Sequence, residues 1–284
     1  MRKEYIPFVE RLIELAIAED IGDGDHTSLA SIPSGTTGRM KLLVKERCVI
    51  AGVEVAEMVF RRLDPSVELE VRIPDGTPVS PGDVVFYVSG RVRTLLQAER
   101  IILNIMQRMS GVATETARYV ALVAGTGCRI LDTRKTTPGS RVLDKMAVRL
   151  GGGENHRMGL FDMILLKDNH VDFAGGIIPA IRGVRDYMAS RGLALPIEVE
   201  VRSLEDIDKV FEEGGRVDRI MLDNFDLDMT RRAVAKIGGK IEIESSGGIR
   251  YETLRAYAET GVDYISVGAL THQIKSVDLS LKAI

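Results

Sequence analysis

Cysteine is scarce in this chain of 284 residues, and long apolar runs are missing. The two cysteines, Cys48 and Cys128, lie far apart and fit no metal-ligand spacing, so we expect two buried thiols and not a disulfide. No segment approaches the roughly 18 apolar residues that a membrane-spanning helix needs. Residues 1–20 lack the continuous apolar core of a signal peptide. The sequence therefore predicts a protein of the reducing cytoplasm with no membrane segment.

A strong excess of either charge is also missing. The 38 basic and 41 acidic residues leave a net charge of −3, which argues against a surface built for nucleic acid. Hydrophobic residues make up 45% of the chain and charged residues 28%, as in ordinary globular enzymes. No repeat or low-complexity linker divides the sequence. Its length allows one large domain or two domains of ordinary size.

The first part of the chain carries patterns of both helices and strands. Residues 4–19 and 53–63 have apolar side chains at helical spacing, and short strands are expected within 36–52. The runs VELEVRI and VVFYVSG predict two further strands on either side of a turn-rich segment. Residues 93–123 keep a helical period, and we predict two consecutive helices that are broken near Ser110 and Gly111.

The second part alternates strand and helix patterns. Short apolar runs recur with helical stretches between them, at 128–132, 163–168, 197–201, 219–224, 241–245 and 264–268. This alternation predicts a parallel sheet, for which a closed or nearly closed barrel is the simplest form. Six strands are clear, and the pattern leaves room for a seventh.

Polar residues gather at the carboxyl ends of these runs. In a parallel barrel those ends share one face, where active sites are built. One group is cationic and comprises Arg134, Lys135, His156, Arg157 and Lys167. Arginine forks and lysine point charges suit carboxylates and phosphates, so this group predicts polyanionic ligands.

Two other groups accompany the cations. Glu200 and Asp223, on neighbouring strands, could hold Mg²⁺ or accept hydrogen bonds from sugar hydroxyls, or else form an ion pair with a lysine. The small residues 245–248 and Gly268 would let backbone N–H groups approach a phosphate. The glycines at 151–153 predict a loop pressed against a ligand or another backbone, and His156 just after them is either a ligand or a packed structural histidine.

Taken together, these motifs resemble the quinolinate phosphoribosyltransferase family over nearly the whole chain. The second-part motifs are DTRKTTPG (132–139), GGGENHR (151–157), KDNH (167–170), EVEV (198–201), LDNF (222–225), ESSGGI (244–249) and VGALTH (267–272). The stretches EDIGDGDHTS (19–28) and ERIILNIMQRMSGVAT (99–114) are similar to the family's N-terminal signatures.

The resemblance implies an α/β fold in two domains. Residues 1–115 would form an N-terminal α/β sandwich with linking helices. Residues 116–284 would form an open α/β barrel of six or seven strands, from which the last segment could return to the first domain. The family resemblance also implies a homodimer with a shared active site, while a higher oligomer stays open.

The implied reaction joins quinolinate to phosphoribosyl pyrophosphate and releases pyrophosphate and CO₂, giving nicotinate mononucleotide for NAD biosynthesis. By motif, quinolinate would contact Arg134, His156, Arg157 and Lys167, together with Arg100 from the other subunit. The donor would contact Lys135, Lys167, Glu200, Asp223, Ser246, Gly247, Gly248, Gly268 and His272. The catalytic residues would be Lys135, Lys167, Glu200 and Asp223, and the cofactor Mg²⁺ would be held by Glu200 and Asp223, directly or through water.

Three other functions compete with this hypothesis. A related phosphoribosyltransferase could act on nicotinate or another pyridine acid. A barrel lyase or aldolase could use Lys135 or Lys167 to form a Schiff base. A protein of the same fold could bind anions without catalysing a reaction.

Overall fold

The computed structural model describes residues 1–284, which separate into two compact units. The first unit comprises Met1–Ala117, Lys135–Gly152 and Ala269–Ile284, and the second comprises Arg118–Arg134 and Gly153–Gly268. The sequence suggested a division near residue 115, with a last segment that could return to the first domain. The contacts group that last segment and also residues 135–152 with the first unit. None of the helices has the length and apolar character that crossing a membrane requires.

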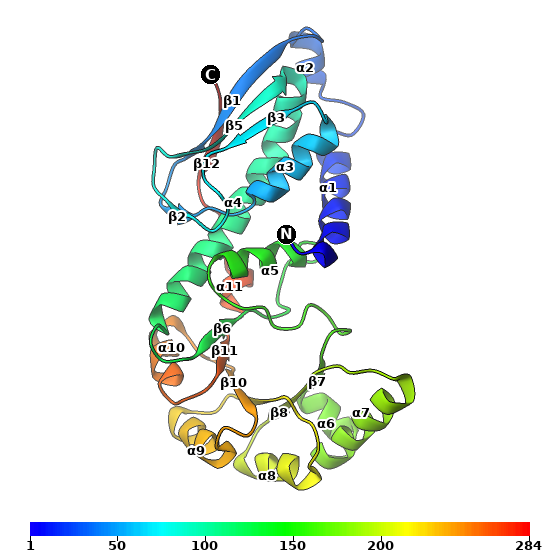
Figure 1. Ribbon diagram of the computed structural model, residues 1–284, viewed down its shortest axis with the longest axis vertical. Coiled ribbons are helices and arrows are strands. Elements are labelled where there is room, and N and C mark those ends of the chain that lie inside the picture. Colours follow the sequence, from blue (N-terminus) through cyan, green and yellow to red (C-terminus); the bar gives the residue numbers. More distant parts are fainter. The chain divides into compact units, whose positions relative to one another are not determined.

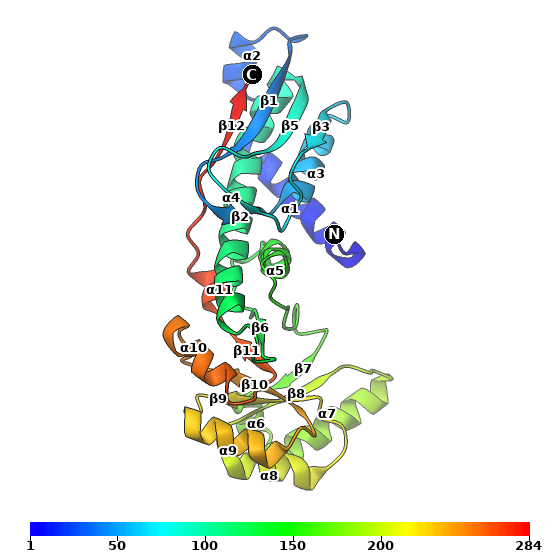
Figure 2. The same cartoon turned by 60° about the vertical axis from the view of Figure 1, so that its left-hand side comes forward.

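The first unit is built on an antiparallel sheet with the strand order β12-β1-β5-β3. Its strands are β1 (Thr37–Val44), β3 (Glu68–Val71), β5 (Val84–Arg91) and β12 (Leu279–Ala283), and a separate small sheet pairs β2 (Cys48–Val49) with β4 (Pro78–Val79). The C-terminal strand β12 therefore returns to the first unit and runs beside β1 (Figure 2).

Helices complete the first unit. They are η1 (Lys3–Tyr5), α1 (Ile6–Asp20), α2 (His26–Ser31), α3 (Val53–Leu63), α4 (Val92–Leu122), α5 (Arg141–Leu150) and α11 (Ala269–His272). The apolar face of α3 is buried, and Phe60 on this helix meets Phe86 on β5 edge to face, with ring centroids 6.2 Å apart. This contact joins helix and sheet in one core.

Helix α4 corrects the prediction of two helices broken near Ser110 and Gly111, because it continues from Val92 to Leu122 without a break. A Cβ atom on Gly111 would lie 2.4 Å from the backbone oxygen of Lys275. The glycine therefore allows another segment of the first unit to approach the helix closely, and it does not end the helix. Gly151 has a similar role, since its Cβ would lie 2.3 Å from the oxygen of Ala113.

The second unit contains six parallel strands in the order β6-β11-β10-β9-β8-β7 (Figure 1). They are β6 (Arg129–Leu131), β7 (Ile164–Leu166), β8 (Ile197–Val201), β9 (Arg219–Asp223), β10 (Glu242–Ser246) and β11 (Tyr264–Ser266). Strands β6 and β7, which are the first two strands of this unit in the sequence, lie at opposite ends of this order. The barrel is therefore open between them, and no seventh strand fills the gap.

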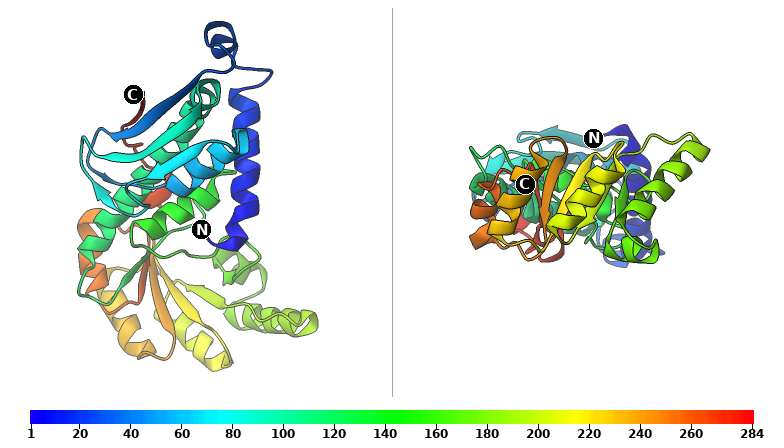
Figure 3. Two further views of the ribbon diagram at one scale, coloured as in Figure 1. Left: turned by 45° about the horizontal axis from the view of Figure 1, so that its top comes forward. Right: turned by 90° about the horizontal axis from the view of Figure 1, so that it is seen from below.

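Helices cover the outside of this curved sheet (Figure 3). They are α6 (Asp168–Phe173), α7 (Ile177–Arg191), α8 (Leu204–Glu213), α9 (Leu227–Ile237) and α10 (Tyr251–Ala258). Helix α8 begins where the Ser203 side chain accepts a hydrogen bond from the Asp206 N–H, and α9 ends at Gly238 with φ +60°. The Ser203 side chain caps the first turn of α8, and the left-handed conformation of Gly238 ends α9 before the chain turns back to β10.

The two cysteines are free and buried, as predicted. Burial raises the pKa of the Cys48 thiol to about 11 and that of Cys128 to about 12. Both side chains therefore stay protonated near neutral pH and pack as small apolar groups.

Replacing Gly111 with alanine should lower the free energy of unfolding by about 2 kcal/mol, because the new methyl group overlaps the Lys275 carbonyl. The matched control is Gly183→Ala within α7, where nothing lies within 4 Å of the added atom. Removing a helical glycine there should raise stability by about 1 kcal/mol. Urea unfolding measures both changes, and a loss at Gly183 as large as that at Gly111 would contradict this explanation.

Candidate active site

Most of the predicted site residues lie in the second unit, at or beyond the carboxyl ends of its strands. Lys167 follows β7, Glu200 lies near the end of β8, Asp223 ends β9 and Ser246 ends β10. The register pairs Asp223 directly with Ser246. Because these strands are parallel and adjacent, their ends align along one edge, as the sequence predicted.

Three predicted residues belong to the first unit: Arg100, Lys135 and His272. Arg100 is exposed on α4. Lys135 and His272 are also exposed, and the backbone oxygen of Lys135 accepts a hydrogen bond of 2.8 Å from the Thr271 hydroxyl. This bond ties the segment that carries Lys135 to helix α11, where His272 is the last residue.

Arg134 and Arg157 bring two positive charges close together in the second unit. Burial, together with the positive charge of Arg134, lowers the pKa of the Arg157 guanidinium. The Arg157 side chain is directed by a hydrogen bond of 3.2 Å from its Nη1 to the backbone oxygen of Met163. An anion bound between the two guanidinium groups would relieve their repulsion, so this pair suits an acidic ligand.

Glu200 and Asp223 bring two negative charges together in the same way. The pKa of Glu200 is raised, first by burial and then by the negative charge of Asp223. The Lys167 ammonium lies 3.9 Å from the carboxylate of Glu200, so an ion pair between them exists alongside the acid pair. A cation or a set of hydroxyl donors would offset the repulsion between the acids. Two carboxylates are also a donor set that Mg²⁺ accepts.

The turn after β10 has an unusual backbone. Gly247 and Gly248 both have positive φ angles, +88° and +64°. A Cβ on Gly247 would lie 2.4 Å from Oδ1 of Asn224, whose own φ is +56°. The N–H of Asn224 donates to the oxygen of Ser246 over 2.9 Å. The glycines are therefore required by geometry here, and they leave backbone accessible for a phosphate.

Asn224 was not among the predicted site residues, although it was noted at the end of its strand. Its side-chain amide donates to the Asp223 carboxylate over 2.8 Å, and its Oδ1 limits the space beside Gly247. It thus connects the acid pair to the glycine turn. The signal available in the sequence was an asparagine directly after an apolar run, a residue type that tolerates positive φ.

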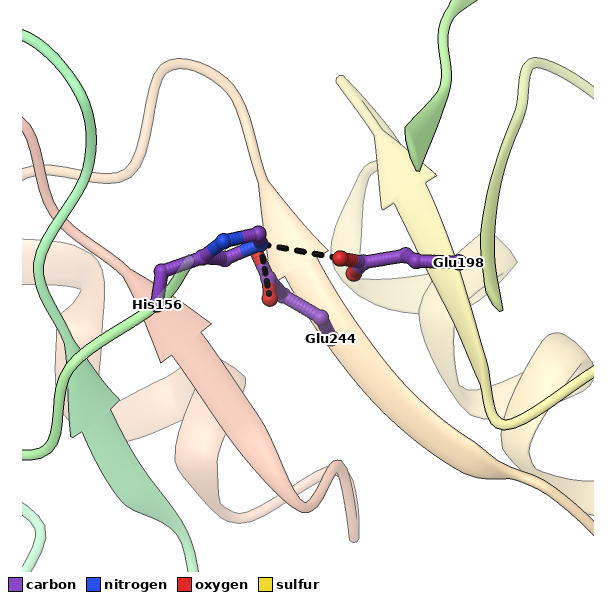
Figure 4. Close-up of side chains that lie close together, drawn as sticks. All are labelled: His156, Glu198 and Glu244. Atoms are coloured by element: carbon purple, nitrogen blue, oxygen red, sulfur yellow. Dashed lines mark ion pairs between the residues drawn. The ribbon is translucent and has the colours of Figure 1, made fainter. Parts of the chain in front are cut away.

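His156 lies inside the barrel, with only 8% of its surface exposed. Its Nε2 is 2.9 Å from Oε2 of Glu198 and 3.5 Å from Oε2 of Glu244 (Figure 4). Its Nδ1 accepts a hydrogen bond of 2.7 Å from the Arg157 N–H. The sequence grouped His156 with the cations that bind an acid, whereas the structure places its ring against two buried acids.

Glu198 and Glu244 were also not among the predicted site residues, and both are fully buried. Their burial raises the pKa of each carboxyl to about 7. The signal was present in the runs IEVEV and IEIES, where alternate positions are acidic although the flanking residues are apolar. Alternation in a buried strand places those acids on one face of the sheet, here the inside of the barrel.

These features define a class of protein. It is a parallel α/β barrel whose strand ends carry paired arginines, paired acids and a glycine turn suited to phosphate, as in barrel enzymes that act on anionic substrates.

Comparison with known proteins identifies the family. The family models described as "Quinolinate phosphoribosyl transferase, N-terminal domain" and "Quinolinate phosphoribosyl transferase, C-terminal domain" match residues 25–110 and 112–282. The chain belongs to the quinolinate phosphoribosyltransferase family.

Two curated relatives and one solved structure illustrate the similarity. The chloroplastic nicotinate-nucleotide pyrophosphorylase [carboxylating] of rice is 45% identical, over 96% of this chain and 77% of its own. The enzyme of that name from Mycobacterium leprae is 42% identical, over 95% of both chains. The crystal structure of NadC from Streptococcus pyogenes is 37% identical over 97% of both chains, with a TM-score of 0.90.

The buried acids predict an effect of pH on stability. The carboxyl pKa is about 7 in the folded protein, against 4.5 when unfolded, so between these values the folded state holds protons that the unfolded state releases. The free energy of unfolding should therefore fall as pH rises from about 4.5 to 7, by up to about 3 kcal/mol for each carboxyl. Urea unfolding at several pH values measures this slope.

The double variant Glu198→Gln/Glu244→Gln should show a much flatter dependence over the same range. The control is Glu242→Gln, which changes a half-exposed acid on β10, the strand that carries Glu244. An equally steep fall in the double variant and the wild type would show that these two carboxyls do not cause it.

Proposed function

We infer that this protein transfers the phosphoribosyl group of phosphoribosyl pyrophosphate to quinolinate, giving nicotinate mononucleotide, pyrophosphate and CO₂ in NAD biosynthesis. The observation that carries this conclusion is the pair Arg134 and Arg157 in the same unit as the acid pair Glu200 and Asp223. A dicarboxylate suits the first pair, and a ribose with its metal-bound pyrophosphate suits the second. The names of the rice and mycobacterial relatives describe this activity.

Quinolinate recognition rests on cations. Arg134 and Arg157 would hold its two carboxylates, and Lys167 would add a third positive charge from the end of β7. His156, whose ring faces the barrel interior, would help to position Arg157 in this pocket, because its Nδ1 accepts a hydrogen bond from the Arg157 backbone N–H. Arg100 would complete the pocket from the other subunit of a homodimer, since the resemblance implies a shared site.

The donor would be held by the remaining groups. Glu200 and Asp223 would accept hydrogen bonds from the ribose hydroxyls, and Lys135 and Lys167 would neutralise the pyrophosphate. The turn at Ser246, Gly247 and Gly248, with Gly268 and His272, would bind phosphate. Glu200 and Asp223 would hold Mg²⁺, directly or through water, and the bound ion would supply positive charge next to the departing pyrophosphate.

The chemistry then needs alignment and charge stabilisation, and no nucleophilic side chain. The pyridine nitrogen attacks C1 of the ribose while the bond from C1 to pyrophosphate breaks, and the lysines stabilise the leaving oxygen. The ring nitrogen then carries a positive charge. The adjacent carboxylate leaves as CO₂, and the electron pair stays on the ring carbon, which is stabilised by the cationic nitrogen until it takes up a proton.

Incubation with quinolinate, phosphoribosyl pyrophosphate and Mg²⁺ tests the function directly. Nicotinate mononucleotide and CO₂ should form in equal amounts, and chelation of Mg²⁺ should stop the reaction. Turnover of nicotinate without CO₂ would point to the related transferase instead. Borohydride trapping of a carbonyl substrate on a lysine would point to a Schiff-base enzyme, and binding without turnover to an anion-binding protein.

We place the reaction in the cytoplasm, where both thiols stay reduced.

Replacing either Lys135 or Lys167 with alanine should lower kcat at least about 100-fold, because each variant lacks a positive charge against the leaving pyrophosphate. Both side chains are exposed, so the variants should fold normally. Steady-state kinetics with circular dichroism as a folding check measures this effect. The matched control is Lys209→Ala on α8, an exposed lysine outside the proposed site, which should leave kcat unchanged.

The shared site predicts complementation between inactive variants. Arg100→Ala and Arg134→Ala should each abolish activity, and mixing the two proteins under conditions of subunit exchange should restore some of it. In a hybrid dimer one of the two sites receives both intact arginines, so recovery should approach about a quarter of wild-type activity. Confirmed exchange with no recovered activity would exclude a shared site.

A further inference from the structure

The opening between β6 and β7 is bridged by residues 153–157, which we call the bridging segment. The N–H of Glu154 donates to the oxygen of Ile130 over 2.8 Å, and the N–H of Asp132 donates to the oxygen of Glu154 over 3.1 Å. These two bonds form a parallel β-bridge between Glu154 and Leu131, so the segment runs parallel to β6 along its free edge. At the other side, Arg157 donates to the oxygen of Met163, directly before β7. The segment therefore contacts both edges of the open barrel.

Side chains fix the shape of the bridging segment. The buried Asp132 carboxylate accepts hydrogen bonds from the His156 N–H over 2.9 Å and from the Asn155 amide over 2.6 Å. Nδ1 of His156 accepts the bond from the Arg157 N–H. A ring nitrogen that accepts carries no proton, so the proton of the neutral imidazole lies on Nε2, the atom that faces the acids.

Figure 4 shows the imidazole of this segment directed at the two acids. Glu198 comes from β8 and Glu244 from β10, so the ring connects the bridging segment to two strands that do not border the opening. Neither carboxylate is accessible to water. Arg219 on β9 holds Glu244, with 3.3 Å between its Nη1 and Oε2 of the acid. Glu244 is thus held inside the barrel by a contact that does not involve the histidine.

We propose that Glu198 and Glu244 are positioning residues: they anchor the His156 ring inside the barrel, and this anchor sets the direction in which Arg157 meets the acidic substrate. The connection between the anchored ring and Arg157 is direct, because Nδ1 of His156 accepts a hydrogen bond from the Arg157 backbone N–H. The part of the proposal that concerns substrate rests on the proposed function. The anchoring of the bridging segment does not.

A metal ion is the other occupant that this cluster suggests. The ligand atoms of His156, Glu198 and Glu244 all lie within 4.8 Å of one another. However, Arg219 contacts Glu244, and the positive charges of Arg219 and Arg157 both act on Glu198. The guanidinium groups of Arg219 and Arg157 already place positive charge beside these acids. A divalent cation in the same buried place would be repelled by both groups, which favours the anchoring role.

The test uses Glu198→Gln and Glu244→Gln in the full-length protein, each of which keeps the side-chain shape and removes the charge that strengthens the contact with Nε2. Amide hydrogen exchange of His156 and Arg157 should become about tenfold faster in each. The KM for quinolinate should rise about tenfold, while the KM for phosphoribosyl pyrophosphate changes less than about twofold. The control is Glu242→Gln, on the same strand and with the same Arg219 partner but with no contact to His156.

A further variant, Glu198→Asp, keeps the charge opposite Arg219 and withdraws the carboxylate from the ring. It should fold even if a glutamine variant does not, and it should show the same changes. Unchanged exchange in the folded variants, or equal changes in Glu242→Gln, would overturn the anchor. So would a transition metal bound in a one-to-one ratio and lost from the variants.

The two hypotheses fail in different ways. If the wild type does not convert quinolinate but exchange at His156 and Arg157 still depends on the acids, the proposed function is wrong and the anchor stands. If quinolinate is converted and its KM rises without any change in exchange, the function stands and the positioning role is wrong.

Discussion

Charge balance inside the barrel is the constraint on which the second unit depends. The strands turn apolar residues outward to the helices, and they turn acids, arginines and a tyrosine inward. Tyr264 lies between the guanidinium groups of Arg219 and Arg129, which stack on its ring at 3.9 and 4.0 Å. Buried charges are costly unless each meets a partner. Strands β8, β9 and β10 therefore depend on one another's charges, because Arg219 on β9 lies opposite Glu198 on β8 and Glu242 on β10. A slip in the register of these three strands would separate those charges.

The interior charges and the proposed site form two layers of the same barrel. Glu198 and Glu200 are two positions apart on β8, so both point inward, one toward the closed interior and the other toward the strand ends. Arg219 and Asp223 repeat this relation on β9, four positions apart. In the lower layer Glu198 and Glu244 have His156 and Arg219 beside them, whereas in the upper layer Arg134 lies near Arg157 and Glu200 lies near Asp223. The lower layer therefore serves as a structural network, and the upper layer favours the binding of ligands.

The sequence predicted the elements well because their signals are local. Six strands were expected and found, and 53–63 was expected as a helix and is one. The break near Gly111 was wrong because the reason for that glycine is a carbonyl at residue 275, far along the chain. The sequence left open whether His156 binds a ligand or packs as a structural histidine, for a similar reason. A histidine beside an arginine looks like part of a cationic pocket, and only the fold reveals the two acids from distant strands that receive its ring.

Strand β12 makes the first unit depend on a segment that follows the barrel strands in the sequence. It pairs with β1 along residues 279–283, so β1 is an interior strand only when these residues are in place. Before residues 279–283 have been made and have folded back, β1 is an exposed edge that can pair wrongly with other chains. The chain thus postpones the closure of its first unit until the barrel strands have all been made.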